Sequence, residues 1–398
     1  MVFSVSLCGG VGVEKWDVVV VGSGPAGSMA AMKAAEGGAK TLVLERQKLP
    51  RFKLCGGGVA AWVIKKLRVP ESVIDREYKV LEYYAPPDYK ALRLPIPASY
   101  YGVYRDRFDR FLLSLAEEAG ATVREKVKVV DVVMEEGWVK GVVTGNGEKI
   151  MSDVVIACDG ALSTVARKSG FWDVWFTSKG ESWREHMSFC VGVEVEMDDE
   201  VIDERFGDSY LFFTGEDVAP IGYAWIFPKK GRLSVGLGSL VETFEEKPKE
   251  YITRFIREHP VASKLLEGGR PSPVKGAYIP TSHPYKPSYG AGVLFAGDSA
   301  GMVSPITGEG IFYAVRAGMD AGVTAAEAVS EGDFSAEFLS RYEERWEEHI
   351  GKHLDFQAEL FREAVGKIRE GGDFGAELIN AFARLIQYLS EYAGRKRK

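Results

Sequence analysis

The sequence predicts an α/β fold that combines a Rossmann-like nucleotide-binding domain with a second, β-sheet-rich α+β domain and C-terminal helices. Three observations predict the first domain. An apolar β-branched run, 18–21, ends in the motif Gly22-x-Gly24-x-x-Gly27, an Ala-rich stretch of helical character follows it, and a second apolar run ends in Glu45. A strand, a glycine-rich turn, a helix and a strand with an acid at its end make the βαβ unit that binds dinucleotides.

Each glycine of this motif has its own expected task. Gly22 permits the tight turn, Gly24 allows the backbone to approach a pyrophosphate, and Gly27 allows the helix to pack on the strand. Glu45 lies about 20 positions beyond Gly24, where a carboxylate accepts ribose hydroxyls, and an acid there favours FAD or NAD over NADP. The expected cofactor-binding residues of this unit are Gly22, Gly24, Ala26, Gly27, Glu45 and Arg46.

Two later apolar runs also end in a carboxylate beside a glycine. Asp159-Gly160 follows the run 154–157, and Gly297-Asp298 follows the run 293–296. Both acids are therefore expected at strand ends, where they would add to the same nucleotide site.

The glycine motif, the Asp-Gly pair and the Gly-Asp pair together resemble the fingerprints of the flavoprotein hydroxylases related to p-hydroxybenzoate hydroxylase. The resemblance implies FAD as the cofactor, with Asp298 binding its ribityl chain and Arg105 lying near it. Asp109 is then expected to open the helix that follows.

An Ala-rich helix is expected soon after Asp298, because Pro305 and several glycines mark its entry. The free N–H groups at such a helix start can stabilise negative charge on a reduced flavin. Cofactor contacts are expected at Gly308, Gly310 and Ile311.

The segment 220–228 is the most specific signal on the substrate side. Side chains alternate along a strand, so Tyr223, Trp225 and Phe227 are expected on one face. The turn 229–231 then leads into a strand whose Gly236 and Gly238 are expected to leave one face without bulk. On pattern alone, the aromatic residues either line a long apolar ligand or fill the core of the sheet.

Two segments resemble the geranylgeranyl reductase family, which includes archaeal digeranylgeranylglycerophospholipid reductases. The segment 220–228 matches the PxxYxWxFP motif of that family, and 53–58 matches its cysteine and glycine loop. The resemblance covers residues 16–330 and implies FAD-dependent saturation of isoprenoid double bonds, as in the geranylgeranyl chains of archaeal ether lipids. It implies flavin contacts at Cys55, Gly56 and Gly57, and substrate contacts at Pro220, Tyr223, Trp225, Phe227 and Pro228.

Saturation of an isolated alkene makes particular demands on the site. With no carbonyl to accept charge, proton transfer to the less substituted carbon and hydride transfer to the tertiary carbon keep the developing charge cationic. The faces of Trp225 and Tyr223 can stabilise that charge by cation–π interaction. Cys55, Tyr223 and Trp225 are the expected catalytic residues. Either Cys55 or Tyr223 is expected to relay the proton, although a thiol at position 55 is also compatible with simple packing.

Other functions fit parts of the sequence. A flavin monooxygenase or halogenase would use the same scaffold, since 223–228 is close to the WxWxIP element of halogenases, although its first Trp is Tyr223 here. A flavin electron carrier would need no long apolar pocket. A serine hydrolase would use Ser299, with His349 or His353 as the base, but would leave the glycine motif unexplained. No third ligand accompanies the two histidines, so no metal site is expected.

Composition favours a large cytoplasmic enzyme. The 398 residues are 46% hydrophobic and 27% charged, which suits two or three domains, and the net charge of −7 argues against a nucleic-acid partner. The cysteines Cys8, Cys55, Cys158 and Cys190 form no CxxC pair, as expected in a reducing compartment. Residues 1–13 do not form a signal peptide pattern, no apolar run reaches the length of a membrane span, and the basic tail 394–398 leaves a peripheral membrane contact open.

Asparagine and glutamine are scarce, whereas Glu, Lys and Arg are abundant. The amides are Asn146, Asn380, Gln47, Gln357 and Gln387. Such a composition is favoured at high temperature, so an archaeal thermophile is the expected source.

The expected domains are interleaved along the chain. The FAD-binding domain comprises 15–80, 100–175 and 275–330, the substrate domain comprises 81–99 and 180–270, and the helical region comprises 331–398. No second GxGxxG motif with its own acid follows, so an NAD(P)H electron donor would bind transiently, and ferredoxin is equally compatible.

Overall fold

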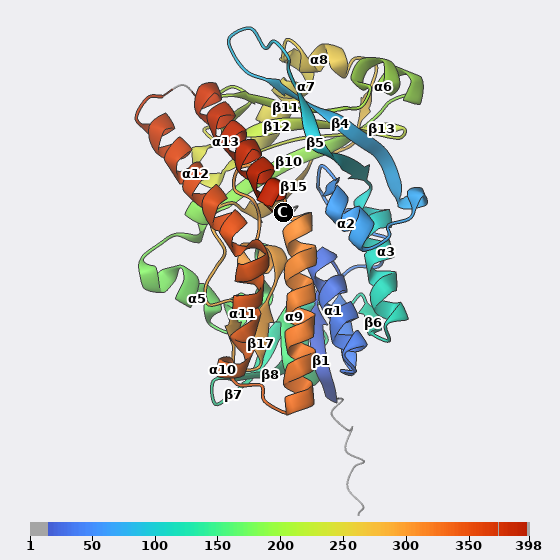
Figure 1. Cartoon of the computed structure of the whole chain (residues 1–398), viewed down its shortest axis with the longest axis vertical. Helices are drawn as coiled ribbons and strands as arrows, with labels where there is room; N and C mark the ends of the chain where they lie inside the picture. Colours follow the sequence, from blue (N-terminus) through green and yellow to red (C-terminus); the bar gives the residue numbers. More distant parts are fainter. Residues whose placement is uncertain (1–14, 373, 396–398) are drawn as a thin grey trace, which may run out of the picture.

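The computed structural model describes residues 15–372 and 374–395. Two β-sheets lie one above the other along the long axis of the molecule, with helices packed around both (Figure 1). This arrangement confirms the predicted α/β class with a second, sheet-rich part and C-terminal helices.

The first sheet is built around parallel strands. The strand β1 (Lys15–Val21) pairs in parallel with β2 (Thr41–Glu45) and β9 (Lys149–Ala157), and β17 (Val293–Phe295) pairs in parallel with β9. The other strands of this sheet are β6 (Thr122–Glu125), β7 (Val129–Glu135), β8 (Trp138–Thr144) and β16 (Tyr289–Gly290). Because parallel strands end at one edge, the motifs that follow β1, β2, β9 and β17 are brought together there.

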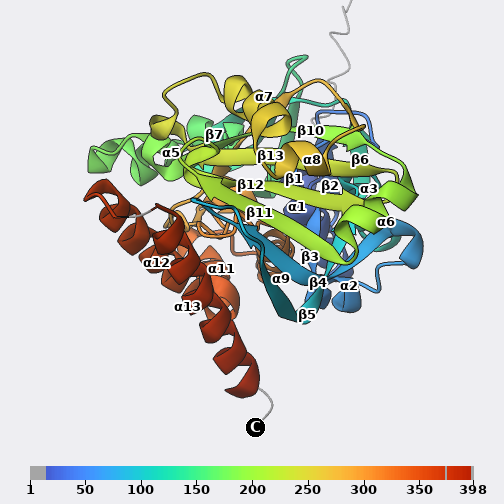
Figure 2. The same ribbon diagram turned by 90° about the horizontal axis from the view of Figure 1, so that it is seen from above.

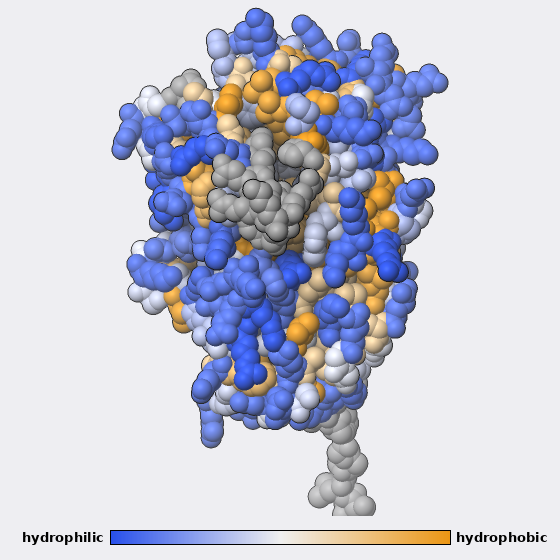
Figure 3. All heavy atoms as spheres, in the orientation of Figure 1, coloured by the Kyte–Doolittle hydropathy of each residue, from blue (hydrophilic) through white to orange (hydrophobic). Residues whose placement is uncertain are grey.

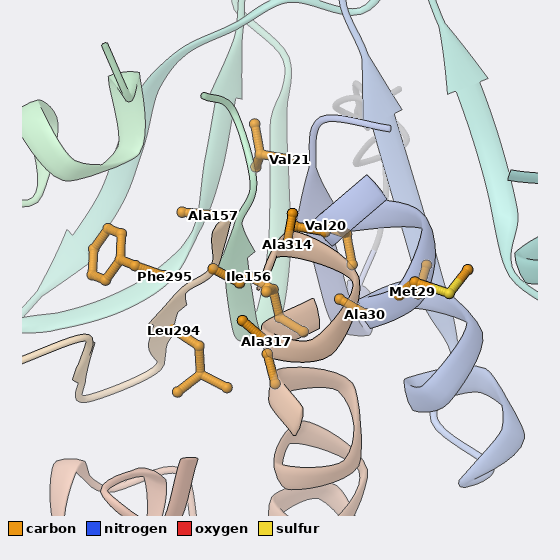
Figure 4. Close-up of a cluster of buried hydrophobic side chains, with 14 of the residues drawn as sticks. Val20, Val21, Met29, Ala30, Ile156, Ala157, Leu294, Phe295, Ala314 and Ala317 are labelled. Atoms are coloured by element: carbon orange, nitrogen blue, oxygen red, sulfur yellow. The ribbon is translucent and has the colours of Figure 1, made fainter. Parts of the chain in front are cut away.

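Two helices cover this sheet, α1 (Pro25–Glu36) and α9 (Ile311–Glu331). Figure 4 shows Val20 of β1, Ile156 of β9 and Leu294 of β17 together with Ala30 of α1 and Ala314 of α9. All five are buried in one hydrophobic cluster. The continuous apolar runs of the strands suit a parallel sheet that is covered by helices.

The second sheet is largely antiparallel. Its central strands run in the order β10 (Met187–Glu196), β13 (Arg232–Leu240), β12 (Ala219–Lys229), β11 (Ser209–Gly215) and β4 (Ile74–Tyr84). The outer strands are β3 (Gly58–Ala60), β5 (Leu92–Val103), β14 (Arg270–Pro271) and β15 (Lys275–Pro280). The predicted hairpin at 229–231 is confirmed, since it joins β12 to β13.

The two faces of the second sheet are covered by different helices (Figure 2). One face packs on α6 (Asp199–Phe206), α7 (Pro248–Glu258) and α8 (Ala262–Leu265), and the other packs on α12 (Lys352–Arg369) and α13 (Phe374–Arg395). The predicted alternation in β12 is confirmed. Ala224 and Ile226 lie on the first face, whereas Trp225 and Phe227 lie on the second.

The sheets divide the chain differently from the expected domain ranges. Strand β3, the start of β4, the end of β5 and strand β15 belong to the second sheet, although their residues fall within 15–80, 100–175 and 275–330. The expected limits at 80 and 100 cut through β4 and β5, which form one antiparallel pair with two register shifts. The domain ranges themselves stay a prediction.

Asp109 does not open a helix. The helix α3 (Arg105–Glu118) begins four residues earlier, with Tyr104 as its N-cap. Asp109 lies in the second turn and is fully buried. Its carboxylate accepts hydrogen bonds from Arg105. The acid therefore serves an ion pair rather than a cap.

The region after Asp333 is helical, as predicted. The remaining helices are α2 (Ala61–Lys66), α4 (Thr164–Lys168), α5 (Phe171–Trp175), α10 (Ala336–Leu339) and α11 (Arg341–Trp346), with a π-helical turn at Glu347–Gly351 and 3-10 turns at Glu71–Val73, Thr177–Lys179, Trp183–His186, Val241–Thr243 and Gly297–Ala300. The predictions for residues 1–13 and for the last residues of the basic tail, 396–398, lie outside the described residues.

The face shown in Figure 3 is largely hydrophilic, with smaller apolar areas between the charged side chains. In the part of the chain that the structure describes, no helix has both the length and the apolar character needed to cross a bilayer.

The contact between α1 and α9 depends on glycines. A Cβ atom at Gly318 would lie 2.2 Å from the carbonyl oxygen of Ala26, whereas one at Gly366 of α12 would meet nothing within 4 Å. Gly318→Ala is expected to lower the free energy of unfolding by about 1–3 kcal/mol, because the helices must move apart.

The matched control Gly366→Ala is expected to raise the free energy of unfolding by about 0.5–1 kcal/mol through helix propensity. Denaturant unfolding of both variants measures the two effects. Equal changes in the two variants would contradict the close packing of α1 on α9.

Candidate active site

A cavity of about 670 Å³ runs along the edge of the first sheet where the parallel strands end. Its wall is formed by the β1–α1 turn, the end of β2, the loop 51–55, the residues after β9 and the entry of α9. Of the residues that the sequence predicts to bind the cofactor, those on this wall are Gly22, Gly24, Ala26, Glu45, Arg46, Cys55, Arg105, Asp159, Gly160, Asp298, Gly308, Gly310 and Ile311.

The glycines of the first motif separate into two groups. Gly22 has a φ of 99°, and a Cβ atom at Gly27 would lie 1.9 Å from the carbonyl oxygen of Gly22, so these two glycines serve the fold. At Gly24, the nearest atom to an added Cβ is a guanidinium nitrogen of Arg51 at 3.9 Å. Gly24 therefore leaves open space at the start of α1, where N–H groups and an arginine can hold a pyrophosphate.

Glu45 ends β2 and is buried on the cavity wall. Its Oε2 accepts hydrogen bonds from the backbone N–H of Ser23 at 3.1 Å and from the Ser23 hydroxyl at 2.7 Å, and its Oε1 accepts one from the N–H of Gln47 at 2.9 Å. These donors orient the carboxylate beside the glycine turn, and its contact with a ribose stays a prediction.

A buried ion network supports the middle of the wall. Asp109 accepts two hydrogen bonds from Arg105, at 2.7 and 3.0 Å, and lies 3.1 Å from Nη1 of Arg51. Burial alone would lower the pKa of Arg105, but the adjacent Asp109 carboxylate and Cys55 raise it above its usual value. Arg105 therefore stays charged at the cavity. Arg51 was missed in the sequence, where only its position beside the cysteine loop pointed to it.

The two later acids differ in their surroundings. Asp159 accepts hydrogen bonds from the Ser163 hydroxyl and from the N–H groups of Thr164 and Val165, so it fixes the start of α4. Burial raises the pKa of Asp159, and these bonds oppose the rise. Asp298 is the second residue of the turn Gly297–Ala300 after β17 and remains partly exposed on the cavity wall.

Four of the predicted cofactor residues lie off this wall. Gly27 packs against Gly22, and Gly297 packs against Ala26, where an added Cβ would come within 3.0 Å of the alanine side chain. Gly56 and Gly57 line a second cavity instead.

The second cavity, of about 330 Å³, lies between the second sheet and the C-terminal helices. Most of its wall is apolar, including Leu81, Leu94, Ile96, Phe212 and Ile221 from the sheet side. Helices α12 and α13 contribute Phe361, Leu378, Phe382 and Leu385. The sequence did not link these helices to the site, because they lie far along the chain from the other lining residues and no motif marks the contact.

The aromatic strand forms part of this wall, since Tyr223, Trp225 and Phe227 all line the cavity. Pro220 and Pro228 are not on the wall, and the Pro228 carbonyl accepts a hydrogen bond from the Tyr78 hydroxyl. Trp225 is 8% exposed, and its indole N–H has no hydrogen-bond partner among the described residues.

Gly236 does not open this cavity as expected. It lies opposite Trp225 in the ladder, and a Cβ atom there would come within 2.3 Å of the indole ring. Gly238 does line the cavity, but an added Cβ would lie 2.6 Å from the sulfur of Cys190. The space beside Gly236 is filled by the aromatic wall itself.

The two cavities share part of their walls. The residues that line both are Leu54, Cys55, Ala277, Ile279, Gly308, Gly310 and Ile311. Cys55 is half-buried there, and its sulfur accepts a hydrogen bond from the N–H of Gly57 at 3.3 Å. A group held in the polar cavity can therefore reach a ligand in the apolar cavity at the Cys55 loop and the entry of α9.

One acid on the apolar wall, Glu309, was missed in the sequence. It lies between Gly308 and Gly310 and faces the cavity beside Tyr100. Burial raises the pKa of Glu309 to about 7, while hydrogen bonding from Tyr100 and from the N–H of Phe312 lowers it in part. The only signal in the sequence was an acid placed between glycines at a helix entry.

The hydrolase alternative is wrong. The Ser299 hydroxyl is buried and donates to the carbonyl oxygens of Ala157 and Ala296, at 2.6 and 2.9 Å. His349 instead lies 2.9 Å from a carboxylate oxygen of Asp320. The serine is therefore a structural link between strand ends rather than a nucleophile paired with a base.

Residues 15–357 match the family model described as FAD binding domain. The chain is 33% identical over 312 residues to the digeranylgeranylglycerophospholipid reductase of Methanocaldococcus jannaschii, covering 77% of this chain and 76% of that protein. It is 36% identical over 318 residues to the digeranylgeranylglycerophospholipid reductase of Methanothrix thermoacetophila, with 77% and 76% covered.

Among solved structures, a geranylgeranyl bacteriochlorophyll reductase-like protein from Thermoplasma acidophilum matches with a TM-score of 0.78 and 27% identity, covering 96% of this chain and 100% of that one. A flavin-dependent brominase matches with a TM-score of 0.66 and 19% identity, covering 94% and 100%. The brominase shares the fold alone.

The open space at Gly24 leads to a prediction about its substitution. Gly24→Val is expected to abolish FAD binding while leaving the melting temperature of the protein without cofactor near that of the wild type, because its side chain meets only the space meant for the ligand. The flavin absorbance that remains with the protein after desalting measures the first effect, and thermal unfolding measures the second.

Gly27→Ala is the matched control within the same motif. It is expected to destabilise the protein itself, because its Cβ would collide with the Gly22 carbonyl. A Gly24→Val variant that retains a full complement of FAD would rule out this cavity as the cofactor site.

Proposed function

The chain belongs to the digeranylgeranylglycerophospholipid reductase family of FAD-binding proteins, and on this premise we propose that it saturates the C=C bonds of geranylgeranyl chains carried by ether lipids. The predicted FAD cofactor is confirmed by this membership. The enzyme is an FAD-dependent oxidoreductase.

One structural observation supports the proposal most strongly. The cavity of about 670 Å³ that holds the dinucleotide-binding turn shares the Cys55 loop and the entry of α9 with the apolar cavity of about 330 Å³. A flavin whose ring reaches this shared wall would face an apolar chain that lies along the aromatic strand. When bound and reduced, the flavin supplies the hydride for the reduction.

The residues of the polar cavity fit FAD. Gly24 and the start of α1, with Arg51 beside them, suit the pyrophosphate, and Glu45 suits the adenosine ribose. Asp298 is proposed to bind the ribityl chain. Gly310 and Ile311 at the start of α9 line the shared wall, and N–H groups of this first turn other than that of Phe312 are proposed to stabilise negative charge on a reduced flavin.

The residues of the apolar cavity fit a long isoprenoid. Most of its lining side chains are apolar or aromatic, as suits an alkene chain. Tyr223 and Trp225 are proposed to lie along the reacting double bond, where their ring faces stabilise developing positive charge by about 0.5–2 kcal/mol. Cys55 is proposed to contact both the flavin and the reacting part of the chain.

The electron donor and the access of the lipid are further parts of the proposal. The electron donor is proposed to be NAD(P)H, bound transiently, or ferredoxin. The lipid is proposed to enter during peripheral contact with a membrane.

A single-turnover experiment tests the function. The FAD-loaded protein is reduced chemically under anaerobic conditions and mixed with a digeranylgeranyl glycerophospholipid in detergent. The flavin absorbance is expected to return without oxygen, and mass spectrometry is expected to show two added hydrogens for each saturated bond. Reoxidation that needs oxygen and leaves the lipid unchanged would favour the monooxygenase alternative.

The aromatic wall leads to a prediction in which stability and activity separate. Trp225→Ala is expected to lower lipid-dependent reoxidation strongly but to cost less than the roughly 3–5 kcal/mol of a buried Trp truncation, because one side of this indole already faces open space. Stopped-flow absorbance and thermal unfolding measure the two effects.

Trp346→Ala is the matched control, since Trp346 is fully buried in the core of the first part of the molecule. It is expected to show the full loss of stability. If Trp225→Ala destabilises the protein as much as the control and reacts with lipid normally, the aromatic strand is core and not a substrate wall.

A further inference from the structure

One ionisable group on the apolar wall, Glu309, lies at the entry of α9, where the N–H of Phe312 bonds to its carboxylate. Glu309 lies in the turn that leads into α9, between two glycines that line both cavities. Glu309 is half-buried as a whole, but its Oε1 is shielded from solvent and has no hydrogen-bond partner among the described residues. A buried carboxyl oxygen without a partner is costly to keep unless it is neutral or serves a ligand.

The surroundings of Glu309 favour its protonated form. Three tyrosines line the same cavity as Glu309, namely Tyr100 of β5, Tyr210 of β11 and Tyr223 of β12. These three and Tyr313 of α9 interact electrostatically with the acid. Among the described residues, no Arg or Lys side chain contributes to the shift of the Glu309 pKa. Burial raises that pKa to about 7, so a substantial fraction of Glu309 carries its proton near neutral pH.

Neighbouring groups are weaker acids. Burial raises the pKa of Tyr223 above its usual value, and its hydroxyl already donates to the carbonyl oxygen of Thr307. Burial raises the pKa of Cys190 to about 12 and that of Tyr100 well above the ordinary tyrosine value. Glu309 is therefore better matched than these three groups to give up a proton near neutral pH.

We propose that Glu309 is the proton donor of the alkene reduction, a role that rests on the proposed function of this site. In each cycle, one alkene carbon takes the hydride, with its electron pair, from the reduced flavin. The other carbon forms its C–H bond with the proton of Glu309, whose O–H bond breaks. The products are a saturated bond, a flavin oxidised by two electrons and a Glu309 carboxylate, which regains a proton from solvent before the next turnover.

Tyr100 acts as a positioning residue for this donor. It lines the same cavity and hydrogen bonds to the Glu309 carboxylate, which lowers the pKa of the acid. Because the reaction needs protonated Glu309, the single-turnover rate falls as pH rises through about 7. Removal of the Tyr100 hydroxyl raises the pKa of Glu309 and moves that fall to higher pH.

The test compares four variants of the FAD-loaded protein in anaerobic single turnover with a digeranylgeranyl glycerophospholipid, over a series of pH values. Glu309→Gln keeps the shape of the side chain and is expected to slow lipid-dependent reoxidation by about 100-fold or more, without loss of FAD. Tyr100→Phe is expected to keep the reaction and shift its pH profile upward. Glu118→Gln, at an exposed position of α3, is the matched control and is expected to behave as the wild type. Cys55→Ser tests the competing donor.

A second measurement does not depend on turnover. Infrared difference titration of the FAD-loaded protein is expected to show a protonated carboxyl band that disappears as pH rises through about 7. The band is expected to be missing in Glu309→Gln and to persist to higher pH in Tyr100→Phe. This readout remains informative even if Glu309→Gln folds poorly, because Tyr100→Phe carries the shift.

The outcomes separate the two proposals. If the wild type does not react with the lipid, the proposed function fails and the donor role fails with it. If the wild type reacts, a Glu309→Gln variant with the wild-type rate and pH profile overturns the donor role alone. Loss of the pH dependence in Cys55→Ser, with Glu309→Gln unaffected, assigns the proton to the thiol instead.

Discussion

The parallel pairing of β9 between β1 and β17 is the constraint on which the site depends. Strands from residues 15–21, 149–157 and 293–295 align so that their carboxyl ends meet at one edge of the sheet. Their side chains form the core with α1 and α9, so the edge geometry is held by buried apolar contacts rather than by the polar residues themselves. The Ser299 hydroxyl adds a link across this edge through the Ala157 carbonyl.

The same alignment of strands also positions the apolar cavity. Because α9 begins directly beyond this edge, its entry turn holds Gly308 and Gly310 on the wall that both cavities share. The long chain connection between β1 and β17 builds the second sheet, and the C-terminal helices then cover one of its faces (Figure 2).

Two acids near this wall have different surroundings. Asp109 is neutralised by two arginines and supports the structure, whereas Glu309 lies among tyrosines with no cation beside it in the described part of the chain.

Local pattern predicted the elements that depend on neighbours in the chain. The motif from Gly22 to Gly27, the alternation around Trp225 and the hairpin that follows it are all set by short-range spacing, and all are present. Errors arose where tertiary contacts decide the outcome. Gly236 was expected to open space, but Trp225 covers it from the next strand, and Asp109 was expected to cap a helix but pairs with Arg105 instead. Arg51 and Glu309 were missed because their only sequence signals were a place beside the cysteine loop and a place between two glycines. The cavity side chains of α13 were missed because nothing near them in the sequence marks what they face.

The proposed meeting point of flavin and isoprenoid is the wall formed by Cys55 and the entry of α9. A crystal structure of the FAD-loaded protein with a fully saturated diphytanyl lipid, which cannot be turned over, tests this most directly. The flavin ring is expected against Cys55 and Gly308, with one chain running past Tyr223 and Trp225 toward α13. A lipid chain bound elsewhere while the flavin lies in the polar cavity, or a flavin ring turned away from Cys55, would contradict it.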